Sequence, residues 1–372
     1  MAGPLQKIAF LLEDFQVPSP GQQLLDRFLI GYPRDGEFHR SKNLQVSAWL
    51  PSPGNPANFG RRAQDFSLRL ATSAEDALRE ADGVVVAPRG AGVKASDELI
   101  RLALEKAPSG ASVFIHGALG NTLEGARLHM KQAASRHIAL VVGTPTAVTW
   151  RLPEIDLPLG TPLREALIVV QGRPLEAELH ALEGLLPVLE RRRGGEAGVR
   201  GIRRLEGTAV WMAGDRGDWS WPLLAAAISR SDTPQGDAVK DGRTQDLVGM
   251  GLVPRLAAHP RAWLIEHRDG LRTTVLVLDG VVADFNFAVK TSDGREFSAQ
   301  LYRPPPPGEQ HFSRLAEVIE NFFRGLPPPW PLERSLLIAG LVETFGGSAA
   351  IRGERVETPE LAIAYKPLQK DR

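Results

Sequence analysis

The fold of this chain depends on the stretch from Ile138 to Arg193, which begins Ile138-Ala-Leu-Val-Val-Gly143 and continues Thr144-Pro-Thr-Ala-Val-Thr-Trp-Arg-Leu-Pro153. The first run is short and apolar and ends at a glycine, which is typical of a buried strand. The second run carries two prolines, which favours an extended crossing. Beyond it, the pattern predicts a strand over 163–170 and a helix over 175–193, whose leucines recur at helical spacing. We therefore predict that one domain ends here and another begins.

Upstream of this crossing, short apolar segments alternate with helical ones. Their spacing matches right-handed βαβ crossovers, which place parallel strands side by side with helices on both faces of the sheet. We therefore predict an α/β fold whose first domain, residues 1–150, is a Rossmann-like parallel sheet of the dinucleotide-binding type. The predicted strands cover residues 7–12, 44–50, 81–88, 111–116 and 138–142.

Downstream, the pattern changes to segments joined by Asp-Gly turns. Asp269-Gly270 and Asp293-Gly294 separate strand-like segments between residues 262 and 303. Because Asp-Gly is a strong hairpin signal, these segments predict an antiparallel meander. Residues 361–365 offer a further edge strand. We expect residues 151–372 to form a second, α+β domain with an open, mostly antiparallel sheet.

The composition narrows the range of partners. A chain of 372 residues is long enough for two domains with their own cores. Its 44 basic and 44 acidic residues cancel, which argues against nucleic acid and anionic membranes as partners. No apolar run approaches the length that spans a bilayer and no signal segment is evident, so we expect a cytoplasmic protein. The chain lacks cysteine and its histidines do not fall at metal-ligand spacing, so we assign no metal.

The turn after the first strand lacks the glycine fingerprint of dinucleotide-binding folds. In that fingerprint, G-x-G-x-x-G lets the backbone approach a pyrophosphate at a helix N-terminus. Here the turn reads Glu13-Asp-Phe-Gln-Val-Pro-Ser-Pro-Gly-Gln22, with one glycine, two prolines and two carboxylates. The carboxylates repel a phosphate and the prolines remove amide donors. The sequence therefore argues against a standard cofactor grip at this turn.

Several segments are similar to the Gfo/Idh/MocA family, the glucose-fructose oxidoreductase and inositol dehydrogenase group. Asp82-Gly-Val-Val-Val-Ala-Pro88 resembles the family's fourth strand, and Thr122-Leu-Glu-Gly-Ala-Arg127 resembles the helix after its E-K-P segment. Residues 191–199 and 211–219 indicate a divergent bacterial branch. The resemblance covers nearly the whole chain. It implies an oxidoreductase fold with NAD(P) as the candidate cofactor.

The resemblance also places candidate catalytic residues. His180 falls where the family's D-x-G-x-H-x-x-D segment has a catalytic histidine, with Glu176 four residues before it and Glu183 three after. Because an imidazole titrates near neutrality, His180 suits acid–base chemistry on a hydroxyl or carbonyl. The alternative is a polar stripe that faces solvent or another domain. The E-K-P lysine has no counterpart, and His116 or Gly117 takes its place.

Four further residues are candidates for binding. Pro88 and Arg89 follow the strand whose exit lies beside the nicotinamide in the family, so they are candidate cofactor contacts, with a plain surface arginine as the alternative. Glu196 follows two glycines that can present a carboxylate at a cleft, and Trp219 offers an indole for stacking on a sugar. Helix termination and core packing explain these two residues equally well. Arg191-Arg-Arg193 is interpreted as a helix C-cap.

Three functions remain open. The first is a Gfo/Idh/MocA-like protein with a degenerate cofactor site that binds a carbohydrate or polyol in the cleft between its domains. The second is an NAD(P)-dependent sugar or polyol dehydrogenase with non-standard cofactor binding, and the third is a catalytically inactive partner or scaffold. The resemblance also implies a homo-oligomer formed through the C-terminal sheet. Its candidate contact residues are Val275, Val277, Phe285 and Phe287.

Overall fold

The computed structural model describes residues 6–51, 56–89, 96–234 and 246–368. Contacts within the chain divide it into two compact units. Unit 1 comprises Met1–Val148 and Pro304–Ala339, and unit 2 comprises Thr149–Arg303 and Gly340–Arg372. The segment Pro304–Ala339 thus belongs to unit 1, although in sequence it lies between the two parts of unit 2.

Unit 1 contains a parallel sheet with the strand order β5-β4-β1-β6-β7-β8. The predicted Rossmann-like sheet is confirmed, and each of the five predicted strands lies within two residues of its expected ends. The strands are β1 (Gln6–Leu12), β4 (Leu44–Trp49), β5 (Arg69–Leu70), β6 (Gly83–Ala87), β7 (Ser112–His116) and β8 (Ala139–Gly143). A separate hairpin is formed by β2 (Tyr32–Arg34) and β3 (Glu37–His39).

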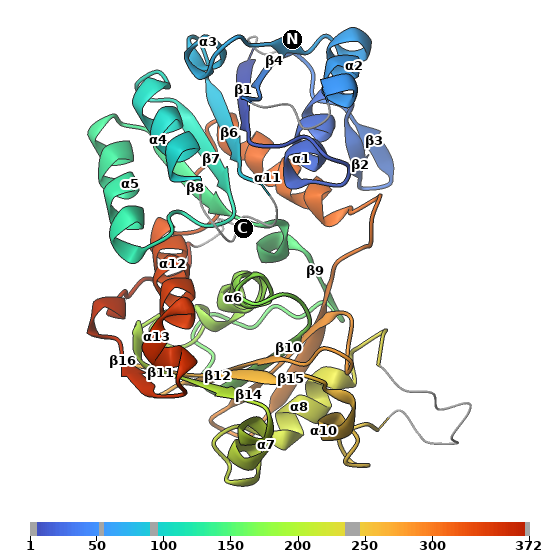
Figure 1. Ribbon diagram of the computed structural model, residues 1–372, viewed down its shortest axis with the longest axis vertical. Coiled ribbons are helices and arrows are strands. Elements are labelled where there is room, and N and C mark those ends of the chain that lie inside the picture. Colours follow the sequence, from blue (N-terminus) through green and yellow to red (C-terminus); the bar gives the residue numbers. More distant parts are fainter. Residues whose placement is uncertain (1–5, 52–55, 90–95, 235–245, 369–372) are drawn as a thin grey trace. The chain divides into compact units, whose positions relative to one another are not determined.

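Helices cover both faces of this sheet (Figure 1). On one face, Phe10 and Phe114 of the strands pack against Phe28 of α1 and Phe312 of α11, so the returning segment completes this core. α3, α4 and α5 cover the other face. The helices are α1 (Pro20–Leu29), α2 (Pro56–Phe66), α3 (Ala74–Leu78), α4 (Asp97–Lys106), α5 (Leu123–Ser135), the 3-10 turn η1 (Pro145–Val148) and α11 (His311–Phe323).

Unit 2 contains a mixed, mostly antiparallel sheet with the order β16-β11-β12-β13-β10-β14-β15-β9, which confirms the predicted open sheet. The predicted continuous meander is wrong. β10 lies between β13 and β14, parallel to the first and antiparallel to the second, because its buried apolar run suits a central position. The strands are β9 (Trp150–Leu152), β10 (Leu163–Val170), β11 (Val199–Glu206), β12 (Arg261–His267), β13 (Arg272–Val277), β14 (Phe285–Thr291), β15 (Glu296–Tyr302) and β16 (Arg355–Glu357).

The sheet ends at β16 rather than at the predicted strand over 361–365. Of that segment, Tyr365 forms an isolated bridge with Glu196, and both of its backbone hydrogen bonds go to that residue. The 3-10 turn η2 (Pro359–Leu361) ends on the first residue of that segment, so the backbone there is turned rather than extended.

Helices also lie on both faces of the second sheet. α6 (Glu176–Leu189) packs on β10 and β13, while α7 (Thr208–Asp215), α8 (Trp221–Ile228) and α10 (Val253–Leu256) form a core with the opposite face. The four residues expected at an interface between copies are between 0% and 5% exposed, so they are enclosed within one chain. Their burial follows from this helical cover. The remaining helices are α12 (Leu332–Gly346), which contributes to both units, and α13 (Ser348–Ile351).

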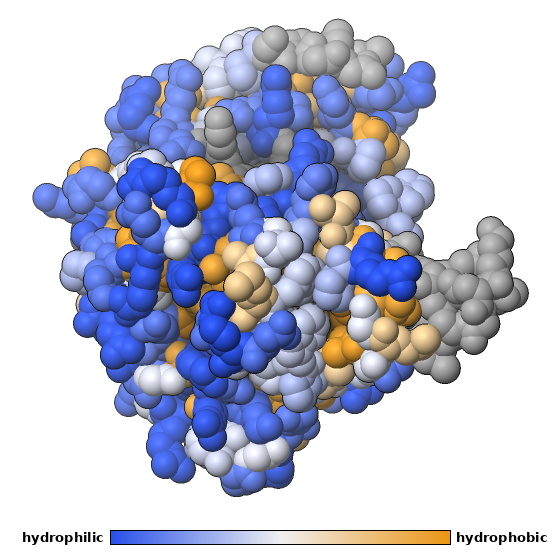
Figure 2. Space-filling view, turned by 60° about the horizontal axis from the view of Figure 1, so that its bottom comes forward, coloured by the Kyte–Doolittle hydropathy of each residue, from blue (hydrophilic) through white to orange (hydrophobic). Residues whose placement is uncertain are grey.

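In the view of Figure 2 the surface is mostly hydrophilic, and hydrophobic side chains form separate patches. Among the described helices, none is long and apolar enough to cross a membrane.

Candidate functional site

The turn between β1 and α1 is tied down by its own carboxylates. Glu13 donates its backbone N–H to the carbonyl of Ala87 (3.2 Å), and its side chain accepts the backbone N–H of Arg89 (2.8 Å). Asp14 follows and is 7% exposed. The turn is thereby held to the end of β6, and two acidic side chains stand at the carboxyl edge of the sheet.

The first turn of α1 has few amides left for an anion. Ser19 is the N-cap, and its hydroxyl accepts the N–H of Gln22 (3.2 Å). Pro20 has no N–H to offer. Gly21 is needed for close packing, because a Cβ at this position would lie 3.1 Å from the carbonyl of Asp14 and 3.2 Å from the side chain of Leu12. The glycine therefore serves helix–strand packing.

The donor set at this turn does not fit a dinucleotide pyrophosphate. In the standard grip, free helix N-terminal amides and glycines meet the anionic phosphates. Here a serine cap, a proline and the side chains of Glu13 and Asp14 occupy the corresponding positions. Placing a pyrophosphate beside two carboxylates costs electrostatic free energy.

His116 is the last residue of β7, at the edge where ligands bind in open parallel sheets. It is 1% exposed and its ring stacks on Phe312, with the centroids 5.9 Å apart. Neither ring nitrogen has a hydrogen-bond partner among the residues that the structure describes. Burial lowers the pKa of His116 to about 4, so the imidazole is neutral at pH 7. Its hydrogen-bonding capacity is therefore not used by the described part of the chain.

The two candidate cofactor contacts differ in exposure. Pro88 is buried after β6, whereas the side chain of Arg89 is exposed. The backbone N–H of Arg89 donates to Glu13. Its guanidinium makes no hydrogen bond or ion pair with the residues that the structure describes.

In unit 2, the stripe predicted on α6 lies along the helix as expected from its spacing. Glu176 is half-buried and pairs with Arg173 at 3.6 Å, while His180 is 6% and Glu183 2% exposed. The ring of His180 lies 6.4 Å from that of Phe285 in an edge-on arrangement. Arg303 places its guanidinium 4.5 Å from the centre of the same ring. The structure thus adds an arginine to the surroundings of His180.

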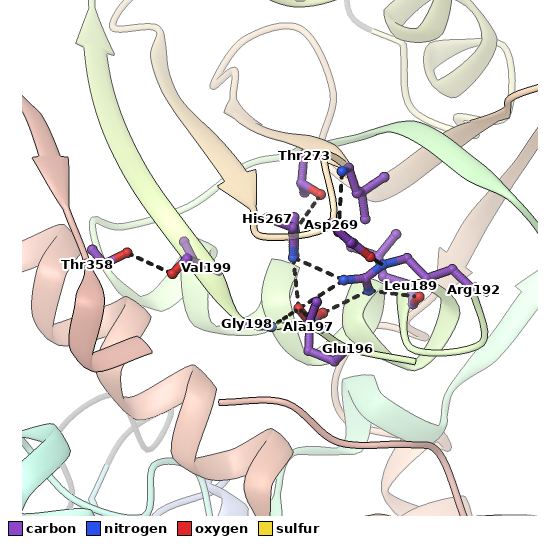
Figure 3. Close-up of polar contacts among 11 residues, drawn as sticks. Leu189, Arg192, Glu196, Ala197, Gly198, Val199, His267, Asp269, Thr273 and Thr358 are labelled. Atoms are coloured by element: carbon purple, nitrogen blue, oxygen red, sulfur yellow. Dashed lines mark hydrogen bonds and ion pairs between the residues drawn. The ribbon is translucent and has the colours of Figure 1, made fainter. Parts of the chain in front are cut away.

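Glu196 is turned inward into a network of buried charges (Figure 3). Its carboxylate accepts hydrogen bonds from Arg192 at 2.9 and 3.0 Å, from Nδ1 of His267 at 2.9 Å, and from the backbone N–H groups of Ala197 and Gly198. Burial by itself would raise the pKa of Glu196, but the charges and hydrogen bonds of His267 and Arg192 hold it well below its usual range. The carboxylate is fully enclosed.

Arg192 and His267 extend this network. Arg192 donates to Asp269 at 2.7 Å and to the carbonyl of Leu189, the last residue of α6, at 3.1 Å, so this arginine of the run has the predicted C-cap contact. Nε2 of His267 lies 3.0 Å from the hydroxyl of Thr273. The resulting order of hydroxyl, imidazole and carboxylate matches that of a catalytic triad. Because Thr273 is 2% exposed, this triad has no access to a substrate.

Trp219 belongs to the core beneath α7 and α8. It is 3% exposed, and its indole N–H donates to the carbonyl of Val210 at 2.8 Å. Trp221 contacts it at 4.5 Å between ring centroids and in turn stacks on Trp211 at 5.8 Å. Both of these outer indoles are half-buried. The stacking surface of this cluster therefore lies on Trp211 and Trp221.

Sequence reasoning missed Arg303 and the partners of Glu196. Arg303 directly follows β15 and precedes the proline run Pro304–Pro307, and no motif marks it in the sequence. The pairing of His267 with Glu196 joins residues 71 positions apart, and no local pattern encodes such a contact. No cluster of three metal-ligating side chains occurs in the described part of the chain.

Comparisons with known proteins show a shared fold at low sequence identity. No family model matches the chain, and no curated protein sequence matches it. The myo-inositol dehydrogenase from Lactobacillus casei, solved with NAD(H) and myo-inositol, is 13% identical with a TM-score of 0.57, and the match covers 95% of this chain and 96% of that one. A putative myo-inositol dehydrogenase from Sinorhizobium meliloti is 12% identical, with a TM-score of 0.58 and coverage of 95% and 99%.

A third similar structure is GenD2 from gentamicin A biosynthesis, solved with NAD. It is 14% identical with a TM-score of 0.57, and the match covers 95% of this chain and 97% of that one. Each of these matches spans nearly the full length of both chains. The chain therefore has the same fold as these two inositol dehydrogenases and GenD2.

Proposed function

We propose that this protein binds a small polyhydroxylated molecule, a carbohydrate or polyol, on an oxidoreductase fold whose standard dinucleotide grip is lost. The observation that carries the proposal is the turn between β1 and α1. There, Glu13 and Asp14 replace glycine backbone with carboxylates, and Ser19 uses the amide of Gln22. A fold that keeps both sheets but loses the phosphate-binding turn favours a ligand without a pyrophosphate.

The ligand class is supported by the candidate residues and by the fold's neighbours. A neutral imidazole both donates and accepts, which suits a hydroxyl group. His180 stands on α6 beside Phe285 and Arg303, an aromatic and cationic environment that suits the faces and edges of a sugar ring. In unit 1, His116 is a separate candidate for a hydroxyl contact, since neither of its ring nitrogens has a hydrogen-bond partner among the described residues. The Lactobacillus casei neighbour was solved with myo-inositol.

The second candidate is an NAD(P)-dependent sugar or polyol dehydrogenase that holds its cofactor by other contacts. It is favoured by the neighbours solved with NAD(H) and NAD. Exposed Arg89 is a candidate for such a contact, since its guanidinium has no partner among the described residues. In this alternative, His180 would act as the acid–base group on the hydroxyl that is oxidised.

Calorimetric titration of the purified chain with NADH, NADPH, myo-inositol and a panel of monosaccharides separates the two candidates. We expect heat from at least one polyol or sugar and none from millimolar dinucleotide. His180→Asn should weaken that binding about tenfold, whereas the exposed His137→Asn serves as a matched control and should leave it unchanged.

Two outcomes would overturn the proposal. Saturable dinucleotide binding at micromolar level would support the dehydrogenase instead, and Glu13→Gln should then strengthen it relative to the exposed control Glu124→Gln. Absence of binding by every polyol, sugar and dinucleotide would favour the inactive partner or scaffold.

A further inference from the structure

A pocket in unit 1 lies away from the carboxyl edge of the parallel sheet. Its volume is about 240 Å³, which is room for a small molecule rather than a single water. Its walls come from β1, β4 and β5 and from α3 with the residues that follow it. In Figure 1 these elements lie at the upper end of the parallel sheet. Lys7, near the start of β1, belongs to the wall, whereas the turn at Glu13 follows the other end of that strand.

Three cations and two acids line this pocket. Lys7 pairs with Glu80, and Arg69 donates two hydrogen bonds of 3.0 Å to the carboxylate of Asp76. Arg79 makes no hydrogen bond or ion pair with any residue that the structure describes. The carboxylate of Asp76 also accepts a hydrogen bond of 3.0 Å from the backbone N–H of Thr72. The two acids are thus paired with Lys7 and Arg69, and the positive charge of Arg79 is not balanced by a further acid of the pocket wall.

Hydrogen-bond donors also outnumber acceptors on the pocket wall. Lys7 has three N–H groups and gives one to Glu80, while the guanidinium of Arg79 keeps all five. The side-chain amide of Gln45 has no partner among the described residues. The hydroxyl of Ser47 donates to the carbonyl of Ala77 at 3.3 Å. A ligand that satisfies this wall must be rich in acceptors.

We propose that this pocket binds the phosphate group of a small molecule. Phosphate offers several acceptor oxygens and a negative charge, which match the spare donors of Lys7, Arg69 and Arg79. The existing ion pairs are only half-buried or exposed, so rearranging them for a ligand costs little. The site is independent of the proposed polyol site, because none of its residues takes part in that proposal.

The test is calorimetric titration of the full chain with inorganic phosphate and with glycerol 3-phosphate at constant ionic strength. Arg79→Gln should weaken binding about tenfold, and its exposed side chain has no partner whose loss would unfold the protein. Lys7→Gln should weaken binding as well. The control is Lys131→Gln on α5, which removes an exposed cation outside the pocket and should leave the affinity unchanged.

Several results would overturn the proposal. One is absence of binding at millimolar phosphate, and another is equal weakening by Arg79→Gln and Lys131→Gln, which would indicate general charge screening. Acetate binding as tightly as phosphate would assign the pocket to carboxylates instead. Tighter binding of glycerol 3-phosphate than of inorganic phosphate would support a phosphorylated metabolite over the free ion, whereas equal affinity would favour the free ion.

Discussion

Two histidines of this chain are equally buried but differ completely in their hydrogen bonding. His116 in unit 1 is 1% exposed and has no partner for either nitrogen among the described residues, whereas His267 in unit 2 is 2% exposed and uses both. Because a carboxylate only accepts, Nδ1 of His267 carries the proton that faces Glu196. Burial alone therefore does not separate a structural histidine from a candidate ligand-binding one, whereas the hydrogen-bond partners of the two ring nitrogens do.

The largest expected effect concerns the carboxylate that holds His267. Glu196→Ala leaves the guanidinium of Arg192 buried without its main counter-charge, so we expect a loss of about 3–5 kcal/mol in the free energy of unfolding. Urea denaturation at pH 7 measures it. The matched control is Glu206→Ala, whose exposed ion pair with Arg204 should contribute less than about 1 kcal/mol. Equal losses for the two variants would mean that the buried network is not stabilising.

The buried carboxylate of Glu196 also predicts that stability depends on pH. The folded-state pKa of Glu196 lies below its unfolded value of about 4.3, so its contribution is complete above that pH and declines as the pH falls further. The difference in unfolding free energy between wild type and Glu196→Gln should therefore shrink as the pH is lowered from about 5 to about 3. A difference that stays constant over this range would contradict an ionised, hydrogen-bonded Glu196.

A smaller loss in the free energy of unfolding is expected from removing the imidazole of His267. His267→Leu leaves the buried hydroxyl of Thr273 without its imidazole partner and removes one of the hydrogen bonds to Glu196, which should cost about 1–3 kcal/mol. Thermal and urea unfolding measure this loss. His267→Gln retains an amide donor and should recover part of it. No recovery by glutamine would show that packing rather than hydrogen bonding makes this position sensitive.

The smallest change in the free energy of unfolding, and one of opposite sign, is expected at His116. His116→Leu removes two buried polar atoms that have no partner among the described residues, so we expect it to be neutral or to stabilise the chain by about 1 kcal/mol at pH 7. The pKa of His116 is about 4 when folded, against about 6.5 when unfolded, so wild type loses stability as the pH falls through this window. His116→Leu should lose less over the same window. A marked loss of stability at pH 7 would show that His116 has a structural role.

The sequence was sufficient for the elements and the general fold. Apolar runs at Gln6–Leu12 and Gly83–Ala87 gave the parallel strands, since fully buried strands leave a local signal that does not depend on partners. The missing glycine fingerprint was visible in the same way. The order of the second sheet was not, because β10 pairs with strands more than 100 residues away.

What the sequence alone determined was five strands of the parallel sheet, the Rossmann-like architecture and the acidic turn after β1, all of which follow from local pattern. Only the tertiary structure decided that Glu196 faces inward, that Trp219 lies in the core and that His116 has no hydrogen-bond partner among the described residues. The physical reason is that the environment of a polar side chain is set by residues brought together from distant parts of the chain. Glu196, Arg192 and His267 form one network only because the end of α6 and the end of β12 meet in the fold.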